Sequence, residues 1–305
     1  MTIDALPPSP LQPLVCAEID AAGIQIFLKR DDSLHPLVSG NKWRKLKYNL
    51  VEMQRQNHHT LLTFGGAYSN HIYATAAAGK LFGFKTIGLI RGEECYPLNA
   101  TLSFAQACGM KLHYLDRATY KNKEEETFLK EVKSKYGACY VLPEGGSNAF
   151  AIEGCKELVE EIKIPFDTIC SPCGTGATFA GLIAGLKPHQ KALGFSALKA
   201  EGYFESKIPD YWNGGTFPNH LYEINYGYHF GGYAKMNREL VTFMDWFAQT
   251  FNIPLEPIYT GKMMYGLFDL LKKQYFPRGT SIVALHTGGL QGLVGMKEKM
   301  ELLRK

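Results

Sequence analysis

A regular alternation of short apolar segments with helical segments constrains this 305-residue chain most strongly. Helix-period stretches of ten or more residues separate most successive segments of strand length. This spacing is typical of parallel strands, because a parallel pair needs a long crossover connection that is usually a helix. The sequence therefore predicts an α/β fold with mainly parallel sheets, whose strands we expect at 24–28, 60–64, 86–90, 111–114, 139–142, 168–171, 194–198 and 281–285.

Three regions of the chain predict other structure. The first twelve residues are rich in proline and predict an extended arm. Residues 121–135 are charged with few apolar positions, which predicts a helix on the surface. Residues 199–233 are rich in Gly, Tyr and Asn without a period, so we expect loops near the site there.

Glycine-rich turns follow three of the predicted strands, at Gly65-Gly66, Gly174-Thr175-Gly176 and Gly288-Gly289. Ligands of open α/β sheets bind at the carboxyl ends of strands, so these turns are candidate binding loops. The stretch 171–178 suits a phosphate group, because glycine amides, threonine hydroxyls and a helix start converge there. A purely structural turn is the alternative. Neither a Walker loop nor a dinucleotide fingerprint fits, since no Lys-Ser or Lys-Thr pair closes the loop and Phe179 replaces the third glycine.

A basic segment, Ser39-Gly40-Asn41-Lys42-Trp43-Arg44-Lys45, begins the helix that follows the first predicted strand. Ser39 or Asn41 can cap this helix. Lys42 and Lys45 share a face of its first turn, although a helix N-terminus already carries partial positive charge. This repulsion predicts an anion beside the two lysines, and a solvated basic face is the alternative.

The composition argues against several classes of function. A net charge of only +4, spread along the chain, does not indicate nucleic-acid or membrane partners. No apolar run has spanning length and the N-terminus lacks a signal-peptide pattern, so we expect a cytoplasmic protein. The seven cysteines are odd in number and scattered, and no histidine or cysteine spacing suits a metal. The segment Cys170-Ser171-Pro172-Cys173 is therefore interpreted as core packing rather than a zinc or redox site.

Motifs along nearly the whole chain resemble the pyridoxal-phosphate enzymes of the 1-aminocyclopropane-1-carboxylate deaminase and D-cysteine desulfhydrase group. They are Lys29-Arg30-Asp31-Asp32, Gly40-Asn41-Lys42 through Lys45-Leu46, Gly65-Gly66 through Ser69-Asn70-His71, Pro143-Glu144-Gly145-Gly146-Ser147-Asn148, Gly174-Thr175-Gly176, Tyr259-Thr260-Gly261-Lys262 and His286-Thr287-Gly288-Gly289. The resemblance implies the tryptophan-synthase-β-like fold (fold type II), with two open, twisted, mainly parallel sheets flanked by helices. A small domain at 47–148 would then be inserted in a large cofactor domain made of 1–46 and 149–305.

The resemblance also implies which residues hold pyridoxal 5′-phosphate. Lys42 would form the internal Schiff base, which fits a lysine near other cations whose pKa is depressed. Lys45 would help to hold the phosphate, and Asn70 would hydrogen-bond the phenolic oxygen of the ring. Tyr259 and Thr287 would lie beside the ring. The phosphate loop would consist of Cys173, Gly174, Thr175, Gly176, Ala177 and Thr178.

The substrate would lie against a second set of residues implied by the resemblance. Ser69 and the backbone amides of Asn70 and His71 would receive the substrate carboxylate, and Tyr233 would line its pocket. Lys42 and Ser69 are the candidates for moving the α-proton. The predicted catalytic set is therefore Lys42, Ser69, Tyr233 and Tyr259.

Thr260 and Thr287 separate two chemistries within the group, and both would also contact the substrate. Members that act on the cyclopropane acid usually carry Glu after the tyrosine and Leu after the histidine. A threonine is less able than a carboxylate to keep the pyridine nitrogen of the cofactor protonated, so we expect α,β-elimination rather than opening of the cyclopropane ring. The expected substrate is D-cysteine, which would yield pyruvate, ammonia and hydrogen sulfide. We also expect the enzyme to be a homodimer. Deamination of the cyclopropane acid and a non-catalytic nucleotide-binding regulator are the alternatives.

Overall fold

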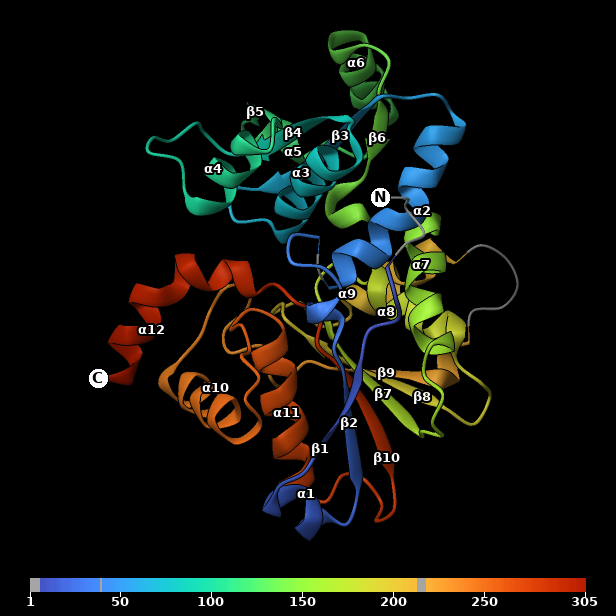
Figure 1. Ribbon diagram of the computed structural model, residues 1–305, viewed down its shortest axis with the longest axis vertical. Helices are drawn as coiled ribbons and strands as arrows, with labels where there is room; N and C mark the ends of the chain where they lie inside the picture. The colour runs from blue at the N-terminus through green and yellow to red at the C-terminus, as the bar shows by residue number, and fades with distance from the viewer. Residues whose placement is uncertain (1–5, 39, 213–217) are drawn as a thin grey trace.

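Two sheets organise the chain in the computed structural model, which describes residues 6–38, 40–212 and 218–305 (Figure 1). The large sheet is parallel except for β1, which pairs antiparallel with β2. The small sheet is entirely parallel. In spatial order the large sheet contains β1 (Leu11–Leu14), β2 (Gln25–Lys29), β10 (Ser281–Leu285), β7 (Thr168–Cys173), β8 (Lys191–Ser196) and β9 (Tyr222–Asn225). The small sheet contains β5 (Lys111–Leu115), β4 (Lys85–Arg91), β3 (Thr60–Gly66) and β6 (Tyr140–Leu142).

Helices cover both faces of the large sheet because its strands are apolar on both faces. Along β10, Ile282 and Ala284 pack in one core cluster, whereas Val283 and Leu285 pack in the other. This alternation follows from the two-residue period of a strand. The first cluster is covered by α1 (Ala17–Ala22), α10 (Arg238–Phe251), α11 (Thr260–Lys272) and α12 (Lys297–Arg304), and the second by α7 (Ala149–Glu160) and α8 (Ala177–Gly185).

The small sheet has the same layered construction. Leu61 packs on one face with α2 (Asn41–Arg55) and α3 (Asn70–Phe82), and its neighbour Leu62 packs on the other. Helix α4 (Ala100–Ala107) lies with α3, and the opposite face carries α5 (Arg117–Lys121) and α6 (Glu126–Tyr136). Shorter helical segments are α9 (Tyr203–Lys207), η1 (Asp31–Ser33), η2 (Glu144–Gly146), η3 (Pro209–Tyr211), η4 (Asn219–Leu221) and η5 (Leu290–Met296).

The chain builds the start of the large sheet, then the small sheet, and then the rest of the large sheet. Helix α2 runs between the two sheets and crosses the predicted boundary at 46/47 (Figure 1). Trp43 and Leu46, which precede that boundary, already pack in one cluster with Leu61 of the small sheet and Ala74 of the helix α3 that covers it. The domain boundaries therefore stay a prediction.

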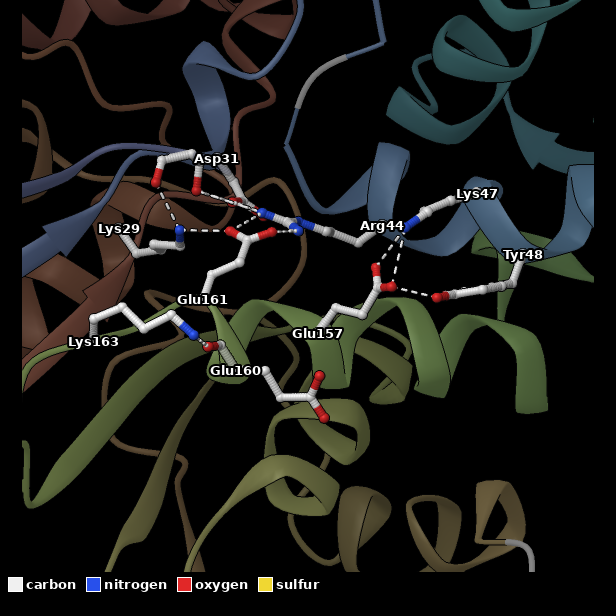
Figure 2. A network of polar contacts seen from close by, with 10 residues as sticks. Lys29, Asp31, Arg44, Lys47, Tyr48, Glu157, Glu160, Glu161 and Lys163 are labelled. Carbon is white, nitrogen blue, oxygen red and sulfur yellow. Dashed lines mark hydrogen bonds and ion pairs between the residues drawn. The ribbon is translucent and has the colours of Figure 1, made fainter. Parts of the chain in front are cut away.

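An ionic network holds the first turns of α2 against the large sheet (Figure 2). Arg44 donates to both Asp31 and Glu161, and Lys29 Nζ lies 2.7 Å from Glu161 Oε2. Gly154 of α7 makes this packing possible, because a Cβ there would lie 1.9 Å from the carbonyl oxygen of Arg44. The network thereby fixes the helix that carries Lys42.

Three expectations about secondary structure were wrong in part. Strand β1, Leu11–Leu14, begins inside the predicted arm and extends past its end, and Pro13 is tolerated because β1 is an edge strand. The region 121–135 is broken, since α5 ends at Lys121 and α6 begins at Glu126. The region 199–233 contains α9 and β9, which are too short for a periodic signal. Of the helices within the described ranges, none is long and apolar enough to cross a membrane.

Candidate active site

The first turn of α2 approaches two other segments of the site. Gly40 precedes the helix with φ +67°, and a Cβ there would lie 2.0 Å from the carbonyl oxygen of Thr287. The predicted cap at Asn41 was wrong, because Gly40 occupies the N-cap position and Asn41 Nδ2 instead donates to Thr178 Oγ1 at 3.0 Å. The alternative cap, Ser39, lies outside the described residues. Glycine is therefore required where α2 begins beside the end of β10.

Lys45 is a buried cation whose hydrogen-bond partners are neutral. Its Nζ donates to Ser147 Oγ at 3.0 Å and to Thr175 Oγ1 at 3.2 Å, and only 1% of the residue is exposed. Burial, reinforced by the charge of Lys42, lowers the pKa of Lys45 well below its ordinary value. No carboxylate among the described residues forms an ion pair with Lys42 or Lys45. An anionic group would therefore be stabilised here.

Lys42 has the chemistry of a nucleophile. Burial lowers the pKa of Lys42 to about 8, although the charges of Cys155 and Glu256 act in the opposite direction. Roughly a tenth of such an amine is neutral at pH 7, compared with less than a thousandth for a lysine of ordinary pKa. Lys42 can therefore attack a carbonyl group at neutral pH.

The loop after β7 has the geometry of a phosphate cradle. Gly176 has φ +89° and no side chain caps α8, so the first amides of that helix are open to a ligand. A Cβ on Gly174 would lie 2.9 Å from Tyr259 Cε1, so this part of the loop must be glycine. Cys173 and Ala177 are buried in the core at its two ends. The open start of α8 and Lys45, which has no carboxylate partner among the described residues, together fit a bound phosphate.

The N-terminus of α3 lies on the small-sheet side of the site. Ser69 caps the helix, and its Oγ accepts from the amides of His71 at 3.2 Å and Ile72 at 3.3 Å. Asn70 Oδ1 accepts from Gln291 Nε2 at 3.1 Å, which orients Asn70 Nδ2 as a donor. That nitrogen would lie 2.8 Å from a Cβ on Gly289, so Asn70 lies against the turn after β10.

The imidazole of His71 is held as a single neutral tautomer. Thr63 Oγ1 donates to the carbonyl oxygen of Leu142 at 2.9 Å and therefore accepts from His71 Nε2 at 2.8 Å. His71 Nδ1 is then an acceptor, and it is buried without a partner among the residues that the structure describes. Burial and the charges of Lys42 and Lys45 hold the pKa of His71 well below its ordinary value. The sequence prediction used only the amide of His71 and missed its ring.

Two tyrosines and a buried carboxylate complete the site. The rings of Tyr233 and Tyr259 meet edge to face, with centroids 6.2 Å apart. Burial raises the pKa of Tyr259 well above its ordinary value, so its phenol stays neutral. The carboxylate of Glu256 accepts from the backbone amides of residues 258–260. Thr260 Oγ1 accepts from the amide of Glu256 at 3.1 Å and donates to Glu256 Oε1 at 3.1 Å. The hydroxyl of Thr260 is therefore engaged with Glu256.

The structure brings the predicted residues together around the carboxyl ends of strands from both sheets, and their individual roles stay predictions. Thr287, only 7% exposed, follows β10 beside the start of α2. Sequence reasoning missed three polar residues, Ser147, Glu256 and Gln291. Ser147 lies in a quoted motif without an assigned role, whereas nothing in the sequence distinguishes the other two from ordinary surface residues. Metal ligation has no candidate cluster within the described residues, and Cys170 and Cys173 are buried free thiols, as the packing interpretation expects.

Residues 4–288 match the family described as "Pyridoxal-phosphate dependent enzyme". The chain belongs to this family. Its cofactor is pyridoxal 5′-phosphate, which fits the unpaired lysines and the glycine cradle. The nucleotide-binding regulator has no support from this result. The predicted resemblance and cofactor are thus confirmed.

Individual proteins within this family are similar to the chain over most of its length. The chain is 30% identical over 317 residues to the mitochondrial bifunctional D-cysteine desulfhydrase/1-aminocyclopropane-1-carboxylate deaminase of Arabidopsis thaliana, covering 92% of this chain and 76% of that protein. It is 28% identical to the D-cysteine desulfhydrase of Klebsiella pneumoniae over 94% of this chain and 93% of that protein. The crystal structure of an ACC deaminase homologue superposes with a TM-score of 0.84 at 28% identity, covering 98% and 95% of the two chains. These matches confirm the predicted fold type II architecture.

Proposed function

We propose that the enzyme catalyses α,β-elimination from a small amino acid, with D-cysteine and water giving pyruvate, ammonia and hydrogen sulfide. The observation that supports elimination is that Thr260 and Thr287, at the two positions that separate elimination from ring opening in this group, are both uncharged. Thr260 follows Tyr259 with its hydroxyl bound to Glu256, and both oxygens of Glu256 accept backbone amides. A free carboxylate is therefore not presented beside Tyr259.

In this proposal Lys42 holds the cofactor until the amino group of the substrate replaces it, and the freed amine of Lys42 then moves the α-proton. When bound, pyridoxal 5′-phosphate withdraws electrons from the α-carbon of the substrate. The amine of Lys42, with a pKa of about 8, is basic enough to take the α-proton and remains partly neutral at the working pH. Ser69 is the second candidate for this proton, and its Oγ lies at the start of α3.

Other residues of the chain hold the two ends of the reacting molecule. Lys45, Ser147 and the open start of α8 bind the phosphate by charge and hydrogen bonds. The start of α3 would bind the substrate carboxylate through Ser69 and the amides of Asn70 and His71. The His71 amide, which donates to Ser69 Oγ in this structure, would turn to the substrate. Asn70 Nδ2, oriented by Gln291, would donate to the phenolic oxygen of the cofactor. The neutral ring of Tyr259 would lie beside the cofactor ring.

The bonds of the reaction balance without an oxidant or a reductant. The Cα–H bond breaks and its proton passes to Lys42. The Cβ–S bond breaks and the sulfur leaves as hydrosulfide, which takes up a proton. Water then hydrolyses the released three-carbon enamine to pyruvate and ammonia.

Product analysis of the purified holoenzyme tests the proposal. The substrates are D- and L-cysteine, D- and L-serine, β-chloroalanine and 1-aminocyclopropane-1-carboxylate, with keto acid and sulfide measured separately. We expect equal amounts of pyruvate and sulfide from D-cysteine. Release of 2-oxobutanoate from the cyclopropane acid, with no pyruvate from D-cysteine, would establish the competing activity that the name of the Arabidopsis relative includes. Homodimeric assembly and a cytoplasmic location belong to the proposal, and sedimentation of the holoenzyme tests the first.

A further inference from the structure

Lys262, in the first turn of α11, is a buried lysine to which the reaction assigns no role. Only 1% of the residue is exposed. Its Nζ donates to the carbonyl oxygens of His229 at 2.9 Å and Gly232 at 2.8 Å. A buried ammonium is retained only where acceptors compensate the loss of water, so these two carbonyls are held firmly against it.

The segment that Lys262 contacts has an unfavourable backbone conformation. Phe230 and Ala234 both have positive φ, +52° and +55°, although neither is glycine. Gly231 and Gly232 between them also have positive φ. Non-glycine residues with positive φ, such as Phe230 and Ala234, persist only where surrounding contacts impose that conformation, and they concentrate at functional sites.

Tyr233 lies within this strained segment and Tyr259 lies three residues before Lys262. The two rings meet edge to face, and 47% of Tyr233 is exposed. The first turn of α11 therefore supports one tyrosine directly and the other through the ammonium of Lys262. We propose that Lys262 is a positioning residue, which holds the segment 229–234 so that Tyr233 forms the substrate-side wall opposite Tyr259. This inference rests on the proposed function, because it takes Tyr233 to contact the substrate.

Hydrogen exchange tests the positioning role without reference to activity. The amides of Gly231, Gly232 and Lys235 form hydrogen bonds within the segment, so their exchange reports whether it is held. We expect Lys262→Met, which keeps the chain length but removes the donors, to speed exchange at 229–235 by at least about tenfold. Lys272→Met is the matched control, since Lys272 is an exposed residue at the end of the same helix. Lys262→Gln, whose shorter side chain cannot reach both carbonyls, gives the same test if Lys262→Met does not fold.

Kinetics of the holoenzyme then test whether Lys262 acts through Tyr233. We expect Lys262→Met to raise KM by about tenfold with a smaller effect on kcat. In the background of Tyr233→Ala the same change should have almost no further effect on KM, because its target is already absent. Unchanged exchange at 229–235, or additive effects on KM, would overturn the proposal. If the wild type acts on no tested amino acid, the proposed function fails, and the exchange experiment still decides the role of Lys262.

Discussion

Arg44 and Glu161 join α2 to the end of α7 through a two-pronged ion pair, in which Nη2 lies 2.8 Å from Oε2 and Nη1 contacts Oε1 (Figure 2). The same guanidinium donates to Asp31, which is completely buried. Arg44 is two residues from Lys42, so this pair fixes the helix turn that carries the predicted nucleophile. The forked guanidinium is essential, because lysine cannot bind two carboxylates in this planar geometry.

The first prediction concerns the stability that Arg44 contributes. Arg44→Met leaves the buried Asp31 without its cationic partner and, among the described residues, with only the Ser9 hydroxyl as a side-chain donor, so we expect the free energy of unfolding to fall by about 3–5 kcal/mol. The control is Arg55→Met on the same helix, because Arg55 is exposed and its ion pair is with Glu52 at the surface. The loss of such an exposed pair should be much smaller than the loss at Arg44. Urea denaturation followed by circular dichroism measures both. Similar losses for the two variants would contradict a special role for Arg44.

The second prediction concerns the acid sensitivity of the network. Burial favours a raised pKa for Glu161, but hydrogen bonds from Arg44 and Lys29 prevail and hold the pKa below its ordinary value of 4.5. A carboxylate with a lowered pKa in the folded state stabilises the protein above pH 4.5, and this contribution is lost as the pH falls below that value. We expect wild-type stability to fall more steeply below pH 4.5 than that of Glu161→Gln. Parallel slopes in denaturation measured from pH 6 to pH 3 would exclude this contribution.

The third prediction concerns the cofactor lysine. Attachment of the cofactor requires the neutral amine of Lys42. The rate of attachment to cofactor-free protein should therefore rise with pH to a plateau, and the midpoint of this rise should lie near 8, the pKa of Lys42, rather than near 10.5. Rapid-mixing measurements of visible absorbance follow the reaction. Lys42→Arg is the control and should show no attachment. Borohydride reduction followed by peptide mapping should label Lys42, and a label on Lys45 or Lys262 would contradict the assignment.

The fourth prediction concerns the phosphate loop. Gly174→Ala places a methyl group 2.9 Å from Tyr259 Cε1, so the ring or the loop must shift. We expect at least about tenfold weaker cofactor retention, equivalent to about 1.4 kcal/mol. Gly176→Val should also weaken retention, because Gly176 has φ +89°. Gly227→Ala is the control, since its Cβ would lie 3.2 Å from Asn225 Oδ1 and would contact no residue of the phosphate loop. Absorbance after dialysis measures how much cofactor the protein retains. Full cofactor occupancy in a soluble Gly174→Ala variant would support a purely structural turn.

The fifth prediction concerns the choice of chemistry by Thr260 and Thr287. The double change Thr260→Glu with Thr287→Leu should lower elimination from D-cysteine by about 1–3 kcal/mol of transition-state stabilisation at each position. Thr260→Glu also places a second carboxylate beside the buried Glu256, so this variant should lose stability as well. Thr287→Leu alone separates the two effects, because it adds no charge. Comparable turnover of D-cysteine and the cyclopropane acid by the wild type would show that the threonines do not discriminate.

The sheets and the glycine loops could be predicted from the sequence because their signals are local. Strand β10 is a continuous apolar run, and its alternation fits burial on both faces. Gly174 and Gly176 follow β7 directly, so their position at its carboxyl end required no tertiary information. The short edge strands β1 and β9 gave no such signal, because four residues are too few to show a period.

The supporting residues could not be predicted because their partners are distant in the chain. Arg44 and Glu161 are 117 residues apart, and Lys45 and Thr175 are 130 apart. Glu256 and Lys262 are charged residues that a sequence alone assigns to the surface, yet both are almost completely buried. Only the folded chain shows that one binds the start of α11 and the other binds the segment that carries Tyr233.

Helix α2 belongs to the cores of both sheets at once. Leu46 and Leu50 are part of the apolar cluster of the small sheet, while Arg44 is part of the ionic network of the large sheet. Neither sheet can lose this helix without exposing buried groups of the other. We therefore expect the two halves to unfold as one cooperative unit, with Lys42 on the helix that couples them.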